Sequence, residues 1–260
     1  YVDLKQLTSI DTIGENFFNN CSALVDIDLS SLTKVQTIQN GFLSNCKSLT
    51  YVNLNGLENV TSLGSNFFAG CSSITYVDLQ LLINVTNVGE YFLANCTSIT
   101  SLDLTPFNGE RSQAGGLASA GDHFLENCSA LVYLDLSPLK KLTSCQKYFI
   151  AGCTGLNYID LSGLLNASTF GDHFLAGCIS LVSIDLSPVS KLTYPSEYFM
   201  TGCSALTSIN LGNNISNGPN YNDTMPFLGV TNLSQNKISG TYASQFKNIM
   251  SHLSNWTVVS

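Results

Sequence analysis

The sequence predicts an α/β protein that folds as one right-handed solenoid, with a parallel sheet on one face and short helical or 3₁₀ turns on the other. Three observations lead to this prediction. A cysteine recurs at an interval of 25 residues, a phenylalanine lies four residues before it, and an alternating apolar stretch follows it. One such unit cannot bury both of its faces, so about eight units are expected to stack on a shared core.

The cysteines set the register of the repeat. They are Cys21, Cys46, Cys71, Cys96, Cys128, Cys153, Cys178 and Cys203. Phenylalanine lies four residues before each of them, and leucine or isoleucine lies three residues after each. The first of these positions takes eight of the fourteen phenylalanines, which we therefore expect inside the core.

Each of these cysteines ends a corner such as Asn66–Cys71, NFFAGC. The residue before the cysteine is always Asn or Gly, the two residues that tolerate the left-handed conformation ending a helical turn. Glu, Asp, Asn or Ser opens the corner in all units except the one with Lys147, and these residues suit a helix start. We expect one short helical or 3₁₀ turn here, with its phenylalanine facing inward.

The stretch after each corner alternates between polar and apolar residues. In Thr50–Leu54, Val52 and Leu54 are apolar and their neighbours are polar. A period of two in a run of β-branched and aromatic residues predicts a half-buried strand. Strands of successive units are expected to lie side by side in a parallel sheet, about 4.8 Å apart.

Two patterns resemble a known family. The spacing L-x-x-L-x-L, as in Leu49–Leu54, is similar to a leucine-rich repeat. The segment Val60–Leu79, VTSLGSNFFAGCSSITYVDL, resembles the BspA-like or treponemal subclass, which carries V-x-x-I-G-x-x-A-F-x-x-C-x-x-L. The resemblance covers residues 1–211 and implies a leucine-rich-repeat solenoid that acts in recognition at the cell surface or outside the cell, rather than an enzyme.

The chain departs from that pattern in two ways. Its unit is two residues longer than usual, and the alanine before the phenylalanine is missing. Its place is taken, in different units, by Asn16, Gly41, Tyr91 or His123.

One unit breaks the period. Cys96 and Cys128 are 32 residues apart, and the seven extra residues fall near 108–118, a glycine-rich stretch that holds the only arginine, Arg111. Insertions in solenoids form loops, often at the binding side. The alternative is an insertion that is merely tolerated.

The repeat pattern stops after Leu211. We therefore assign residues 1–211 to a leucine-rich repeat array and residues 212–260 to a C-terminal capping region, because the last unit needs a cover. In this region a helix is predicted by the spacing of Phe246, Ile249, Met250 and Leu253, and a strand by Trp256–Val259. Nothing equivalent precedes Tyr1, so we expect the native protein to extend further upstream.

Composition excludes several classes of partner. The chain has a net charge of −8 with a single arginine, whereas binding to nucleic acid draws on clustered Lys and Arg. No apolar run approaches the roughly 18 residues of a membrane helix, so no transmembrane segment is predicted. No basic segment followed by an apolar one precedes the first unit, so no signal peptide is visible.

The nine cysteines are expected to fill space in the core. No two of them have the close spacing of a zinc site, and Cys145 and Cys153, the nearest pair, have seven residues between them. Side chains that run parallel in a ladder keep their Cβ atoms about 4.8 Å apart, whereas a disulfide needs about 3.8 Å. We expect reduced, buried and unmetallated thiols. Unpaired cysteines favour a reducing compartment, whereas the family resemblance implies the cell surface.

No catalytic site is apparent. His123 and His173 share a position two units apart, about 10 Å by strand spacing, which is too far to ligate one metal ion. Tyr91, Tyr148 and Tyr198 hold that position in other units, which indicates semi-exposed packing. Neither a G-x-S-x-G motif nor a G-x-x-x-x-G-K loop occurs. We expect no enzyme, no metal and no cofactor.

The outward strand positions form a file of Asp and Asn residues, and in several units the preceding outward position, two residues earlier, is a tyrosine. The file consists of Asp3, Asp28, Asn53, Asp78, Asp103, Asp135, Asp160, Asp185 and Asn210. Carboxylates about 5 Å apart repel one another by about 1 kcal/mol or less in water. They persist either because solvent screens them, or because hydroxyls, a cation or a basic partner compensates.

Aromatic platforms beside acceptors suit a protein epitope or a sugar. The candidate ligand-binding residues are therefore Tyr51, Tyr76, Tyr133, Tyr158, Asp78, Asp103, Asp135 and Asp160.

Three functions remain open on sequence grounds. The first is a recognition or adhesion module that binds a protein or another macromolecule through this face. The second is a carbohydrate-binding module that uses the pairs Tyr51–Tyr76 and Tyr133–Tyr158. The third is a spacer in a larger surface protein, with no ligand in this segment.

Overall fold

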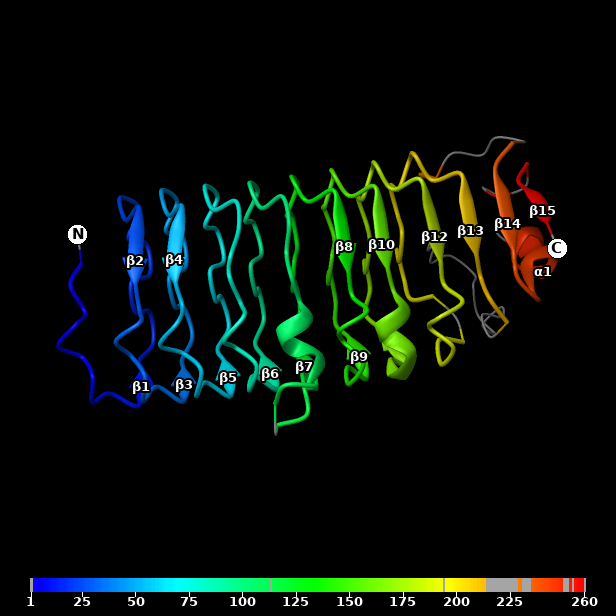
Figure 1. Cartoon of the computed structure of the whole chain (residues 1–260). Coiled ribbons are helices and arrows are strands. Elements are labelled where there is room, and N and C mark those ends of the chain that lie inside the picture. The colour runs from blue at the N-terminus through cyan, green and yellow to red at the C-terminus, as the bar shows by residue number, and fades with distance from the viewer. Residues whose placement is uncertain are drawn as a thin grey trace.

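A computed structural model confirms the solenoid (Figure 1). It describes residues 2–112, 114–193, 195–213, 229–230, 235–249, 253 and 255–259. The coil advances by one turn per sequence unit, and its turns are joined by parallel strand pairing. Within the described residues, no helix is both long and apolar enough to cross a membrane.

The first ladder contains the strands predicted from the alternating stretches. Parallel pairs join β2 (Asp26–Asp28) to β4 (Tyr51–Asn53), and β8 (Tyr133–Asp135) to β10 (Tyr158–Asp160). A four-stranded parallel sheet contains β12 (Ser183–Asp185), β13 (Ser208–Asn210), β14 (Lys237–Ser239) and β15 (Thr257–Val259). Residues 76–78 and 101–103 hold the same place in their units but lie outside these strands. In β4 the central Val52 is buried and Tyr51 is exposed, as the period of two predicts.

A second ladder runs along the solenoid where the sequence indicated only a return segment. Five strands pair in parallel in the order β1 (Thr12–Ile13), β3 (Thr37–Ile38), β5 (Ser62–Leu63), β6 (Asn87–Val88) and β7 (Ser119–Ala120). A separate pair joins β9 (Ser144–Cys145) to β11 (Thr169–Phe170). Two residues are too few to show a period of two, which is why the sequence pattern did not reveal these strands.

The corner before each cysteine is built differently from the continuous helical turn expected. Asn66, Phe68 and Gly70 all have left-handed φ angles, of 61°, 58° and 75°. Only short turn bonds form, such as Cys71 N–H to the Phe68 carbonyl at 3.1 Å. The other N–H groups reach neighbouring turns, as Asn66 N–H does in donating to the Glu90 carbonyl at 2.7 Å. The expected left-handed Asn or Gly before the cysteine is present.

Regular helices are few among the described residues. They are η1 (Thr105–Asn108), η2 (Ser162–Asn166) and α1 (Ala243–Ile249). Both 3₁₀ helices directly follow the sheet positions of their units, and η1 opens the inserted segment.

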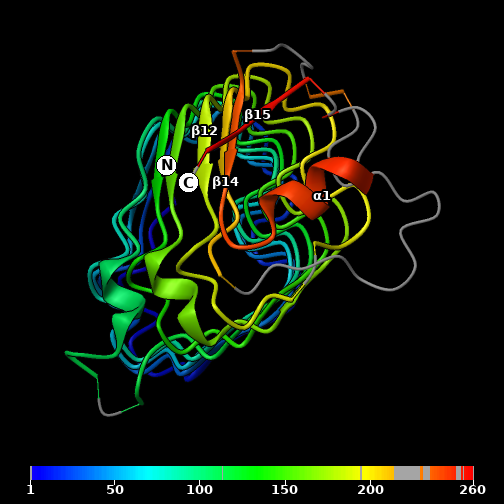
Figure 2. The same ribbon diagram turned by 90° about the vertical axis from the view of Figure 1, so that its right-hand side faces the viewer.

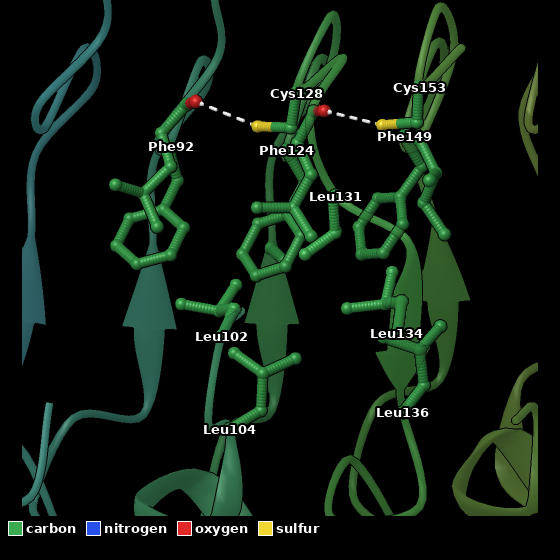
Figure 3. Packing of buried hydrophobic residues seen from close by; sticks show 14 of the residues in the cluster. Phe92, Leu102, Leu104, Phe124, Cys128, Leu131, Leu134, Leu136, Phe149 and Cys153 are labelled. Carbon is green, nitrogen blue, oxygen red and sulfur yellow. Dashed lines mark hydrogen bonds between the residues drawn. The ribbon is translucent and has the colours of Figure 1, made fainter. Parts of the chain in front are cut away.

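The core is a column of phenylalanines, one from each corner. Successive rings from Phe17 to Phe199 stack with centroids 4.7–6.3 Å apart. Figure 3 shows Phe92, Phe124 and Phe149 above leucines of the first ladder. Every ring of the column from Phe42 onward is buried. This confirms that the repeated phenylalanine faces inward.

The segment after residue 211 extends the coil. Strands β14 and β15 continue the first ladder, and α1 lies in front of the last turns in Figure 2. Leu253 and Trp256 are fully buried. Helix α1 and strand β15 match the helix and strand predicted here, whereas Met250 lies outside the described residues.

Candidate functional site

The first ladder presents its candidate residues on one surface, which we call the Tyr/Asp face. It is defined by Tyr51, Tyr76, Tyr133, Tyr158, Asp78, Asp103, Asp135 and Asp160. The tyrosines are 61%, 47%, 50% and 52% exposed in that order. In the described chain they are the only large aromatic residues with such exposure. The alternation of a strand, with Val52 or Leu134 turned inward, exposes the tyrosines of the strands. Tyr76 lies outside a strand but alternates in the same way with the buried Val77.

The four tyrosines form two different pairs. Tyr133 and Tyr158 stack, with ring centroids 5.6 Å apart and planes at 5°. Tyr51 and Tyr76 instead line a hollow of about 150 Å³, together with Asn53, Asn55 and Asp78. No sequence pattern predicted this difference, because both pairs occupy the same positions of adjacent units.

The acidic file has a structural role that sequence reasoning missed. Each side chain accepts a hydrogen bond from the backbone N–H two residues later, as Asp135 does from Ser137 at 2.7 Å. The same bond forms at Asp78 and Asp103, and the amide oxygen of Asn53 accepts it from the Asn55 N–H at 3.1 Å. Such Asx turns satisfy the backbone where the chain leaves the strand. The recurring Asp or Asn followed by a polar residue two positions on was the available signal.

The second carboxylate oxygens differ along the file. Asp103 uses its Oδ2 atom to accept the Gln80 amide at 2.8 Å, and Arg111 donates to the other end of Gln80 at 3.4 Å. Asp135 and Asp160 are paired in register on β8 and β10, and each uses only its Oδ1 atom among the described contacts. Two carboxylate oxygens therefore lie free beside the stacked tyrosines.

The electrostatic field of the face is negative. Partial burial, followed by the nearby carboxylates of Asp135 and Asp160, raises the pKa of Tyr133 above its usual value. Burial and then Asp78 and Asp103 raise the pKa of Tyr76 in the same way. Both effects disfavour an ionised tyrosine, and burial is the larger of the two, with the carboxylates adding to it.

The inserted segment is tied back to the array. Leu117 N–H bonds the Phe107 carbonyl at 3.0 Å, and Phe107 is buried. Ser112 donates to the Asn84 side chain at 2.9 Å. Through Gln80, Arg111 is linked to Asp103, so the insertion borders the Tyr/Asp face at the ends of its strands.

The cysteines are internal and have a role beyond filling space. Eight of the nine are buried, and Cys21 is half-buried. From Cys46 to Cys203, each repeat cysteine donates its S–H to a backbone carbonyl of the preceding turn, at 3.0–3.4 Å. Figure 3 shows two of these bonds, from Cys128 and Cys153. Burial raises the pKa of the Cys96 and Cys203 thiols to about 12, so both are protonated at neutral pH.

Metal-binding geometry is absent from the described residues. No group of three or more His, Cys, Asp or Glu side chains is arranged to hold a metal ion there. His123 and His173 are separated by the ring of Tyr148, which stacks on both.

The chain was compared with models of known protein families and with curated proteins. A family model described as the BspA type leucine rich repeat region matches in six copies, over residues 2–111 and 118–244. No curated protein matches the chain.

Several solved structures are similar. A leucine-rich repeat protein of T. pallidum is 18% identical, with 66% of this chain and 72% of that chain covered and a TM-score of 0.52, which supports the fold. A leucine-rich repeat protein from Bacteroides ovatus is 16% identical, with 97% and 82% covered and a TM-score of 0.46. A leucine rich cell surface protein from Faecalibacterium prausnitzii is 18% identical, with 94% and 80% covered and a TM-score of 0.44.

Proposed function

Because the chain belongs to the BspA-type leucine-rich repeat family, we propose that it is a recognition or adhesion module that binds a partner protein through the Tyr/Asp face. Solenoids of this kind offer an extended, rigid surface for binding. We place this role at the cell surface or outside the cell, as the family implies, and assign no enzymatic step to the chain.

The observation that carries the proposal is the exposed stack of Tyr133 and Tyr158. Half-exposed aromatic rings offer a large contact area, and little conformational entropy is lost when they are held on a rigid sheet. Folding does not require tyrosine at this position, since Ser183 and Ser208 hold it in the next two strands of the ladder. Strand geometry therefore explains why the side chains at 133 and 158 are exposed, but not why they are tyrosines.

The chemistry of the face favours a basic segment of the partner. The free Oδ2 atoms of Asp135 and Asp160 lie next to the tyrosine stack, where an Arg or Lys side chain can pair with a carboxylate and pack on a ring. The same carboxylates contribute, after burial, to the raised pKa of Tyr133. Such an interface associates faster at low ionic strength.

The proposal is tested by selecting binders from a random peptide library and measuring their affinity by calorimetry. We expect the selected peptides to carry Arg or Lys with aromatic or hydroxyl-bearing residues. Tyr133→Ser and Tyr158→Ser should each weaken binding by roughly 1–3 kcal/mol. Asp135→Asn with Asp160→Asn should weaken it at low salt, and should leave the Asx turns intact because Asn53 and Asn210 make them already.

Two controls separate binding from folding. The melting temperature of the Tyr→Ser variants should match that of the wild type, and Glu58→Gln, a charge change outside the Tyr/Asp face, should leave binding unchanged. Equal affinity of the wild type and the variant with Ser at 51, 76, 133 and 158 would remove this face from consideration. The inserted segment around Arg111 would then be the next surface to test.

A carbohydrate is the second candidate ligand of the face. It is favoured by the hollow between Tyr51 and Tyr76, whose walls carry two aromatic rings and the side chains of Asn53, Asn55 and Asp78. If a sugar ring binds between these tyrosines, the double variant Tyr51→Ser with Tyr76→Ser should bind it more weakly. The double variant Tyr133→Ser with Tyr158→Ser should bind it as the wild type does. A peptide bound at the stacked pair shows the opposite dependence.

A further inference from the structure

A second row of aromatic rings runs along the corners of the solenoid. Five residues before the cysteine, successive units carry Tyr91, His123, Tyr148, His173 and Tyr198, and these rings form one continuous stack. Their centroids lie 4.3–4.9 Å apart and neighbouring planes are within 21°. We call this the Tyr/His column; it shares no residue with the Tyr/Asp face.

The column stops abruptly at Tyr91. One face of this ring packs on His123 at 4.3 Å. On the other side the equivalent residue of the preceding unit is Asn66, which has no ring, and no described aromatic residue stacks there. An open groove of about 410 Å³ lies at this point, and its lining includes Asn45, Lys47, Asn66, Ser72, Tyr91 and Asn95.

The groove holds polar groups without partners. Among the described residues, the side chains of Asn66, Ser72 and Lys47 make no hydrogen bond. Asn95 uses only its amide oxygen, which accepts from Asn127 at 3.0 Å, so its amide nitrogen is available. The Asn66 amide offers donors and an acceptor, the Asn95 amide nitrogen offers donors, and the Ser72 hydroxyl can both donate and accept.

We propose that this groove binds a saccharide, with one sugar ring stacked on the open face of Tyr91. The ring would take the next place in the column, at a spacing that the column already uses. Its hydroxyls would pair with the amides of Asn66 and Asn95 and with Ser72, which can donate and accept. The volume suits one or two sugar residues, and the wall has no carboxylate to favour a cation instead.

Neighbouring units supply variants that test this site without disturbing the fold. Tyr91→Asn removes the platform, and Asn is already present at this position in two units, at the same left-handed φ of about 60°. Asn66→Tyr should extend the column by one ring and so occupy the place of the sugar; Tyr91 shows that tyrosine fits this backbone. Tyr198→Asn removes the ring at the far end of the column and is the matched control.

The probe is a glycan array, followed by calorimetric titration of the oligosaccharide that the wild type retains. We expect Tyr91→Asn and Asn66→Tyr each to weaken binding about tenfold or more, and Tyr198→Asn to leave it unchanged. The variant with Ser at 51, 76, 133 and 158 should also bind the glycan normally, which separates this site from the Tyr/Asp face.

Three results would overturn the proposal. The first is that the wild type binds no glycan on the array. The second is that Tyr91→Asn and Asn66→Tyr bind the glycan as tightly as the wild type does. The third is that only the variant with Ser at 51, 76, 133 and 158 loses the glycan. The last would assign the sugar to the Tyr/Asp face.

Discussion

At the scale of single residues, the repeat cysteine combines two requirements. It must fill a tight buried corner, and its S–H must add a bond to a carbonyl of the preceding turn, such as that of Leu125, which among the described residues otherwise accepts only from Cys128 N–H at 3.3 Å. Cys153 meets both, because it is fully buried and donates to the Leu125 carbonyl at 3.2 Å. The sequence predicted the first requirement from the spacing alone. It could not predict the second, because the acceptor lies 28 residues away on another turn.

A pair of variants isolates the thiol hydrogen bond. Cys153→Ala removes both packing and the bond, so we expect the free energy of unfolding to fall by roughly 2 kcal/mol. Cys145→Ala removes only packing, since Cys145 donates no such bond among the described residues and Ala120 already holds its position in the preceding strand. Urea denaturation should therefore show the larger loss for Cys153→Ala. Equal losses of stability in the two variants would show that the S–H bond of Cys153 adds nothing beyond its packing.

At the scale of elements, the backbones of neighbouring turns touch. A Cβ atom on Gly89 would lie 2.5 Å from the backbone nitrogen of Ser65, closer than real contacts allow. The position therefore needs glycine for space rather than for conformation. This close approach lies directly after the paired strands β5 and β6 of the second ladder, which end just before Gly64 and Gly89.

Gly89→Ala should accordingly destabilise the array. The new methyl group meets backbone atoms that can move only if two turns separate, so we expect a loss of about 1–3 kcal/mol on urea denaturation. Gly14 is the control, because it holds the same position in the first unit and a Cβ atom there has nothing within 4 Å. Gly14→Ala should leave stability unchanged or raise it slightly. A Gly89→Ala protein as stable as Gly14→Ala would show that the turns are not tightly stacked.

At the scale of the whole molecule, the buried thiols act together through their protonation. Burial raises the pKa of Cys96 and Cys203 to about 12, and raises the pKa of Cys128, Cys153 and Cys178 well above its usual value. An unfolded thiol ionises at about 8.5. Between these values the unfolded chain has lost protons that the folded chain keeps, so the free energy of unfolding falls as pH rises.

We therefore expect sharp alkaline destabilisation of the solenoid. Each of these five thiols, and likewise Cys145, whose pKa burial also raises, should contribute a loss of about 2 kcal/mol between pH 8 and pH 10, and little loss below pH 8. Urea denaturation over this range measures the slope. Cys145→Ala lacks one buried thiol and should lose correspondingly less stability than the wild type over the same interval. Parallel slopes for the two proteins would contradict the linkage.

The sequence alone determined the repeat, its core and its outward files, because a period of 25 residues, one phenylalanine per corner and a period of two on the strand are local patterns. It correctly placed Phe149 inside and Tyr133 outside. Contacts between turns were decided only by the tertiary structure. They include the S–H bond of Cys153, the pairing of the short second-ladder strands and the Tyr/His column with its open end at Tyr91. Each depends on the distance and rotation between stacked turns, which packing of the whole core sets and which no pattern within one unit records.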